Sequence, residues 1–61
     1  MNYYDVFYKS PAGYSGTHYA VYAVNQYEAA KISSIMLCYG TNWNPVDFTV
    51  LDVQLSNNIP I

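Results

Sequence analysis

Residues 17–24, THYAVYAV, restrict the possible folds because both of their alternating sets of side chains are apolar. A strand of this kind is typical of a sheet that is covered on both faces. The chain has only 61 residues, however, and we identify a single helical segment in it, directly after this strand. One helix covers one face of a sheet. The sequence therefore predicts a second apolar face that something else must cover.

Three segments alternate as strands, namely residues 3–10, 17–24 and 47–55. The first two are joined by PAGYSG at 11–16, where one proline and two glycines indicate a hairpin loop. The first two strands therefore form an antiparallel hairpin. The third strand follows the helix and a loop at 41–46.

The helix is predicted over residues 26–39. Asn25 is suited to be its N-cap, with Glu28 placed three residues later as in a capping box. Gly40 is suited to the left-handed position that ends a helix, and Pro45 follows soon after it. The N-terminal and C-terminal boundaries of the helix are thus both marked by residue type.

The elements have the order β-β-α-β and form one α+β domain over residues 1–61. A right-handed crossover through the helix places the third strand beside the first, giving a three-stranded antiparallel sheet in the order 2-1-3 with the helix on one face. The helix-facing residues of the sheet are then expected to be Tyr4, Val6, Tyr8, Ala20, Tyr22, Val24, Leu51, Val53 and Leu55. The apolar stripe expected to pack on them is Ala29, Ile32, Ile35, Met36 and Tyr39.

The opposite sheet face is predicted to be the interface of a homodimer, because large exposed apolar surfaces usually bind something. Its residues are Tyr3, Phe7, Tyr19, Val21, Phe48 and Val50. In the alternative, the 41–46 loop and the C-terminal tail cover this face, with Trp43 and Ile59 as lids. A second interaction surface is predicted from four large side chains: Tyr14, Tyr27, Leu37 and Trp43. The two of these that belong to the helix lie on its outward face, where Lys31 is the only charged residue.

Composition excludes several classes of function. Charged residues make up 10% of the chain, against about 25% in typical domains. The only basic residues are Lys9 and Lys31, so duplex nucleic acid is not an expected ligand. No apolar run is long enough for a membrane span, and the N-terminus does not read as a secretory signal. We expect a cytoplasmic protein.

Residues for catalysis or cofactor binding do not assemble in the sequence. With one cysteine, Cys38, and one histidine, His18, neither an internal disulfide nor a Cys/His metal site is expected. GYSGT at 13–17 lacks the G-x-S-x-G spacing of a nucleophile elbow, because Thr17 replaces the second glycine. We therefore expect a protein without enzymatic activity and without a cofactor.

The segment AVNQYEAAK, with Y-x-V-Y-x-V running into it and D-F-x-V-x-D-V after it, resembles the compact β-β-α-β proteins encoded by bacteriophages and other mobile elements. Some members of that group, such as phage inhibitors of uracil-DNA glycosylase, are homodimers that block a host enzyme. The resemblance implies a small inhibitor or adaptor that binds a host protein, such as a defence or metabolic protein. Those inhibitors are markedly acidic, whereas this chain has a net charge of −2, which argues against DNA mimicry.

The function expected from these observations is that of a non-catalytic, homodimeric protein-interaction module. A second hypothesis is a protein that binds or sequesters a small, nucleotide-like ligand between tyrosines at the dimer seam. A third is a structural accessory subunit of a larger assembly, in which the apolar surface is an assembly face. The sequence does not discriminate between the first and the third.

Overall fold

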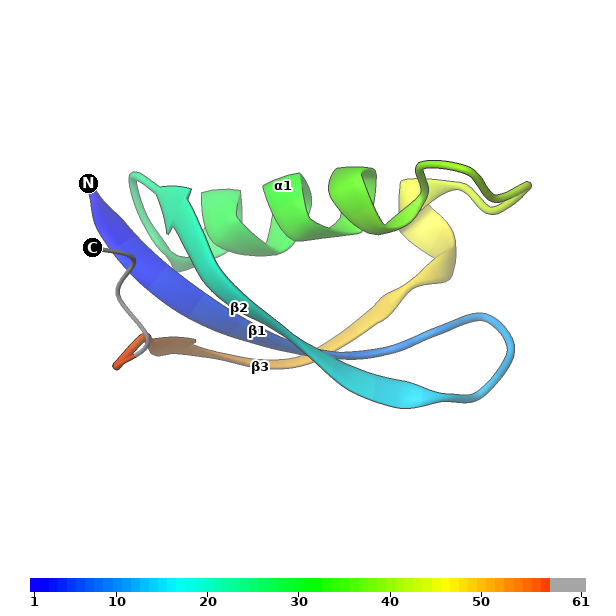
Figure 1. Ribbon diagram of the computed structural model, residues 1–61, viewed down its shortest axis with the longest axis horizontal. Coiled ribbons are helices and arrows are strands. Elements are labelled where there is room, and N and C mark those ends of the chain that lie inside the picture. The colour runs from blue at the N-terminus through cyan, green and yellow to red at the C-terminus, as the bar shows by residue number, and fades with distance from the viewer. Residues whose placement is uncertain (58–61) are drawn as a thin grey trace.

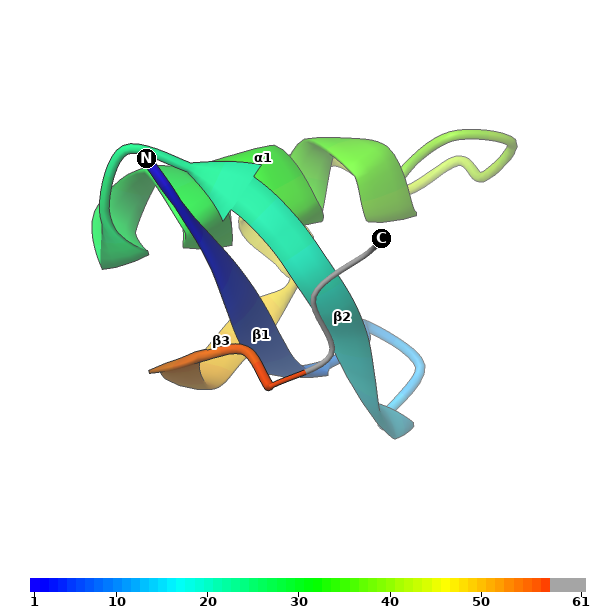
Figure 2. The ribbon, with the colours of Figure 1, turned by 60° about the vertical axis from the view of Figure 1, so that its left-hand side comes forward.

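The computed structural model describes residues 1–57 and has the predicted fold: an antiparallel sheet in the order β2-β1-β3 with one α-helix on one of its faces. Figure 1 shows α1 as a separate layer beside the twisted sheet, and Figure 2 shows β1 between its two neighbours. The elements are β1 (Asn2–Lys9), β2 (Ser15–Ala23), α1 (Gln26–Leu37), the short 3-10 helix η1 (Pro45–Asp47) and β3 (Thr49–Leu55).

Both predicted boundary residues of α1 act as expected. The Asn25 side chain accepts a hydrogen bond from the Glu28 backbone N–H at 2.8 Å, which satisfies one of the free amides of the first turn. Gly40 has φ +77°, a conformation that favours glycine. The helix itself ends at Leu37, two residues earlier than predicted, with Cys38 as its C-cap.

A β-bulge in β2 inverts the predicted assignment of side chains to the two faces. The pairing with β1 shifts between Tyr4↔Val21 and Val6↔His18, so that two residues, Tyr19 and Ala20, lie opposite one. An extra residue changes which side of the sheet every later side chain faces. Val21 and the residues that follow therefore have the opposite orientation to the one predicted.

A second bulge has the same effect in β3. The pairing with β1 shifts between Phe7↔Asp52 and Tyr8↔Val50, which leaves Leu51 as the extra residue. Val50 is thereby turned to the face that carries α1, although it was predicted on the opposite face. No glycine or proline marks either bulge in the sequence.

The core lies between α1 and the end of the hairpin that is farthest from its loop. Its buried cluster is formed by Tyr4, Val6, Val21, Ala23 and Ala29, against which Ile32 and Val53 pack. Of the predicted helix-facing set, Tyr4, Val6 and Val53 are in this core, whereas Tyr22, Val24, Leu51 and Leu55 are exposed. The core is small even for a chain of this length, which leaves a thin margin of stability.

The helix is rotated about its axis relative to the prediction. Ala29 and Ser33 are its buried residues, while Ile35, Met36 and Tyr39 are 44%, 50% and 80% exposed. Small side chains let the helix backbone approach the sheet closely, and Ser33 Oγ lies 2.8 Å from His18 Nδ1 of β2. Of the predicted inward stripe, Ala29 and Ile32 contribute to the core, whereas the three larger residues nearer the C-terminal end are exposed.

A second, aromatic cluster lies at the start of β3. The Phe48 ring makes edge contacts with Tyr8 and Trp43, at centroid distances of 5.9 and 5.8 Å. Gly16 pairs with Tyr8, and a Cβ at Gly16 would lie 2.6 Å from the Tyr8 hydroxyl, so the absence of a side chain there makes room for the ring. This cluster anchors the connection from α1 to β3.

Candidate functional site

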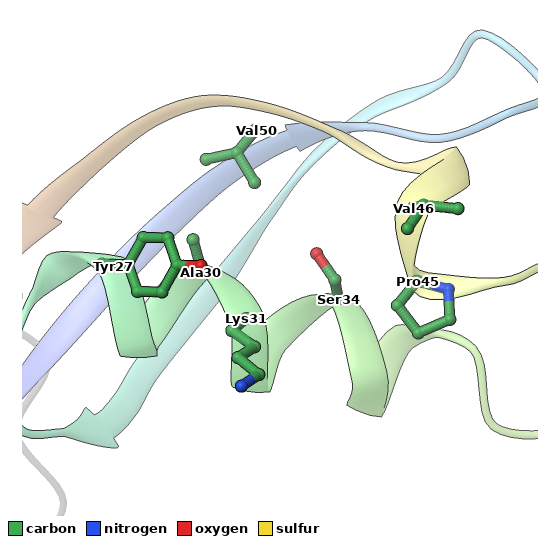
Figure 3. A pocket seen from close by; sticks show the side chains of 7 residues that line it. All are labelled: Tyr27, Ala30, Lys31, Ser34, Pro45, Val46 and Val50. Atoms are coloured by element: carbon green, nitrogen blue, oxygen red, sulfur yellow. The ribbon is translucent and has the colours of Figure 1, made fainter.

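A groove lies between α1, η1 and β3. Its volume is about 260 Å³. Figure 3 shows the helix on one side of it and the strand and the 3-10 helix on the other. The residues that line it are Tyr27, Ala30, Lys31, Ser34, Pro45, Val46 and Val50.

Helical periodicity produces one wall of this groove. Tyr27, Ala30, Lys31 and Ser34 are spaced i, i+3, i+4 and i+7, so they form one continuous stripe along α1. The bulge in β3 turns Val50 toward this stripe. The groove thus depends on a feature of β3 that alternation alone does not predict.

The groove is open and mostly apolar. Tyr27 is 77% exposed and Val46 89% exposed, which are high values for large apolar side chains. Lys31 is the only charged residue of the lining, and no acidic group of residues 1–57 forms an ion pair with it. The groove therefore offers apolar contact beside one unpaired ammonium group.

The six residues predicted for the sheet interface do not form one surface. Val21 lies in the core, Phe48 is buried in the aromatic cluster and Val50 lines the groove. Their assignment to the outer sheet face is wrong because of the two bulges and because Phe48 precedes β3. Tyr3 and Phe7 alternate with the core residues of β1 and do lie on the face away from α1.

The outer sheet face has a different composition from the one predicted. Tyr3 and Tyr22 pack there with ring centroids 4.7 Å apart. Tyr19, from the bulge in β2, is exposed. Asp5 alternates with the core residues too, is buried, and its Oδ1 accepts the Ala20 N–H at 3.0 Å. A carboxylate therefore lies among the aromatic rings of this face.

The predicted second interaction surface is also dispersed. Tyr27 belongs to the groove, whereas Tyr14 is exposed at the tip of the hairpin, which projects away from α1 (Figure 1). Leu37 is half-buried at the end of α1, and Trp43 packs on Phe48. Of the two residues predicted as lids in the alternative, Trp43 packs on Phe48, and Ile59 lies outside the described residues. Pro45 and Val46 of the groove were not predicted from the sequence, because neither belongs to a periodic pattern of apolar residues.

His18 and Cys38, the two candidate reactive residues, do not form a pair. The hydrogen-bond partner of His18 is Ser33, whose hydroxyl is fully buried and cannot reach a substrate. Partial burial raises the pKa of the Cys38 thiol, and the negative charge of Asp47 raises it further. A raised pKa lowers the thiolate fraction at neutral pH, which disfavours a nucleophilic role.

Residues 1–57 contain neither a metal-binding cluster nor a membrane-spanning helix. No three side chains among His, Cys, Asp and Glu are grouped so that they could hold a metal ion. No helix in the same range has the length and apolar character needed to cross a bilayer.

The architecture defines an α+β protein of β-β-α-β order with an apolar groove at one edge of its sheet. No protein-family model, no curated protein and no solved structure matches the chain.

Proposed function

We propose that this chain is a non-catalytic protein-binding module, an inhibitor or adaptor, whose groove between α1, η1 and β3 receives a segment of its partner. The observation that carries the proposal is the combination of exposed apolar side chains from three elements with one unpaired lysine. Such a surface binds a partner that presents an apolar side chain next to a carboxylate. In the setting that the phage resemblance implies, the partner is a cytoplasmic host protein.

The size of the groove supports a protein partner over a small ligand. Pockets for small molecules usually enclose about 300 Å³ or more, whereas this groove holds about 260 Å³ and is open. One inserted side chain fills such a volume. The remaining binding energy would come from flat contacts around the rim, as in other protein interfaces.

A pull-down with matched variants tests the proposal. Val46→Asp places a carboxylate in the groove at a position so exposed that folding is not affected, and Lys31→Glu reverses the only charge of the lining. The control is Tyr14→Ala, which removes an equally exposed aromatic side chain at the hairpin tip. Partners recovered from lysate of the host cell are quantified by mass spectrometry for each bait.

The expected result is one partner that wild type and Tyr14→Ala recover equally and that both groove variants lose. Recovery of the same partner by all four baits would reject the groove as the binding site. A stoichiometric complex that survives purification would favour the accessory-subunit hypothesis. Amide chemical-shift changes at the groove on addition of mononucleotides would favour the small-ligand hypothesis.

A further inference from the structure

The bulge in β2 divides the pairing of this strand with β1 into two halves. On the loop side, residues 15–18 pair with β1 without interruption. Beyond Tyr19 and Ala20 the pairing is shifted by one residue, so that Val21 lies opposite Tyr4. Without the bulge, the pairing of residues 15–18 would continue and Ala20 would lie opposite Tyr4. We call the observed pairing the bulged register and the uninterrupted pairing the slipped register.

The residues of β2 beyond the bulge are apolar on both faces. In the bulged register, Val21 and Ala23 are buried in the core. In the slipped register, the residues directed toward α1 would be Ala20 and Tyr22, which are apolar as well. In most strands a shift by one residue exchanges a buried apolar face for a polar one, and this penalty fixes the register. The penalty is reduced in β2, so its sequence is compatible with both registers.

The connection between β2 and α1 can take up the extra residue. Residues 24–25 join the two elements (Figure 1), and the slipped register would lengthen this connection by one residue rather than stretch it. Two contacts that hold α1 against the sheet involve none of the shifted residues. Ser33 Oγ lies 2.8 Å from His18 Nδ1, on the loop side of the bulge. Gln26 Nε2 donates to the Val53 carbonyl of β3 at 3.1 Å. The slip therefore leaves these anchors of α1 in place.

Two features at Ala20 act in opposite directions on the balance between the registers. Its φ of +55° is unfavourable for alanine, and this cost exists only in the bulged register. Against it, the Ala20 N–H donates to Oδ1 of the buried Asp5 at 3.0 Å. A hydrogen bond to a carboxylate is stronger than one between neutral groups, and burial strengthens it further. In the slipped register the Ala20 N–H returns to the plane of the sheet, and this bond is lost.

Side-chain size also favours the bulged register. Ala23 is fully buried, whereas Tyr22 is 52% exposed. In the slipped register the Tyr22 ring would lie next to α1 in place of the Ala23 methyl group, and Ala20 would fill only part of the space that Val21 occupies. Overpacking at one site and a void at the other both reduce stability. The bulged register is therefore the major one.

We propose that β2 is a strand with two registers, in which the Asp5 carboxylate holds the bulged register and the slipped register is a minor folded state. The slip moves Val21 from the core to the face away from α1 and turns Tyr22 toward the helix. It also separates the rings of Tyr3 and Tyr22, whose centroids are 4.7 Å apart in the bulged register. The groove contains no residue of β2, so this inference goes beyond the proposed function and does not depend on it.

Two substitutions of Ala20 should shift the balance in opposite directions. Ala20→Val should select the slipped register, because a β-branched residue rarely adopts a positive φ and because valine at this position replaces the volume that Val21 leaves. Ala20→Gly is the matched control and should select the bulged register, since glycine adopts a positive φ without penalty. Cross-strand nuclear Overhauser effects to Tyr4 identify the register in each protein.

The expected result is that Tyr4 contacts Val21 across the strands in wild type and in Ala20→Gly, and that it contacts position 20 in Ala20→Val. An Ala20→Val variant that folds with Val21 still opposite Tyr4 would overturn the inference. An Ala20→Val variant that does not fold would overturn it too, because it would show that the slipped register is not a stable state.

The role of Asp5 is tested separately with Asp5→Ala. Loss of a hydrogen bond to a charged acceptor should raise the ratio of slipped to bulged molecules by roughly 10- to 100-fold. Chemical exchange saturation transfer at the amides of residues 20–24 measures the minor population. Adding Ala20→Gly to Asp5→Ala should lower that population again. An unchanged ratio in Asp5→Ala, or a complete loss of its fold, would reject the carboxylate as the group that holds the bulged register.

Discussion

Ala20 is the only residue other than glycine in residues 1–57 with a left-handed backbone, at φ +55°. This conformation costs an alanine about 1 kcal/mol or more relative to an extended one. It is maintained where the β2 bulge directs the Ala20 N–H to the Asp5 carboxylate, at 3.0 Å. A buried hydrogen bond to a charged acceptor offsets part of this cost.

Ala20→Gly should therefore stabilise the protein. Glycine adopts a positive φ without penalty, and we expect the free energy of unfolding to rise by up to about 1 kcal/mol. The control is Ala12→Gly in the hairpin loop, where φ is not positive and a small loss is expected. Urea denaturation measures both. A destabilised Ala20→Gly variant would show that the bulge imposes no strain.

The Cys38 thiol should react slowly with alkylating reagents. Its pKa is raised by partial burial and by Asp47, so less thiolate is present at a given pH than in a free cysteine. The pH at which the iodoacetamide rate reaches half its maximum should lie above the usual value of about 8.5. Asp47→Asn should move that midpoint down, because it removes a negative charge. An unchanged rate profile in Asp47→Asn would exclude the effect of Asp47.

The elements show which features the sequence could predict. Alternation, the Asn25 cap and Gly40 were sufficient for the element order, the sheet order and the start of α1, whereas the end of α1 was predicted two residues too late. The two bulges could not be predicted, because an inserted residue such as Leu51 has no distinctive type, yet it reverses the faces of the residues on one side of it relative to those on the other. This is why Val21 and Val50 were assigned to the wrong face.

The rotation of α1 could not be predicted for another reason. Hydrophobicity alone favours burial of Ile35, Met36 and Tyr39. In the fold, however, Ala29 and Ser33 are the buried residues of α1, because their small side chains permit a closer approach of the helix to the sheet. The signal for this choice is the pairing of Ser33 with His18, two residues 15 positions apart. Only the folded arrangement shows that the inward face is the one with small side chains. The groove followed from the same rotation, since it turned Tyr27 and Ala30 toward β3.

The free edge of β3 is protected by side chains. The Val53 N–H donates to Asp52 Oδ1 at 2.9 Å, and the Val53 carbonyl accepts from Gln26 Nε2 at 3.1 Å. Backbone groups that are occupied in this way are not available to another strand. Asp52 is also the only charged residue of β3.

Asp52→Ala should therefore increase aggregation through strand pairing. The variant frees the Val53 N–H and removes the only charge of an otherwise uncharged edge. We expect a shorter lag in thioflavin T fluorescence than for wild type at equal concentration. Gln54→Ala, which leaves the bond between Asp52 and Val53 in place, should behave like wild type. Equal lag times for all three proteins would contradict a protective role of Asp52.

The molecule as a whole has more apolar surface outside than its small core explains. The core is one cluster of five buried residues, and Tyr27, Ile35 and Met36 of α1 are exposed. A chain of this size without a disulfide or a metal site commonly gains stability by association.

Thermal stability should therefore depend on protein concentration. Because dimerisation stabilises only the folded chain, the unfolding midpoint of wild type should rise as the protein is concentrated. Differential scanning calorimetry at several concentrations measures this midpoint. A concentration-independent midpoint for wild type would mean that the monomer is stable by itself.

The contact between Trp43 and Phe48 can be followed by the intrinsic fluorescence of the chain. Trp43 is the only tryptophan, and its edge contact with Phe48 ties its indole to the α1–β3 connection rather than to the main core. Emission from this single fluorophore reports on that connection, while far-ultraviolet dichroism reports on the helix. Recording both during one melt would reveal whether the aromatic end detaches before the rest of the molecule does.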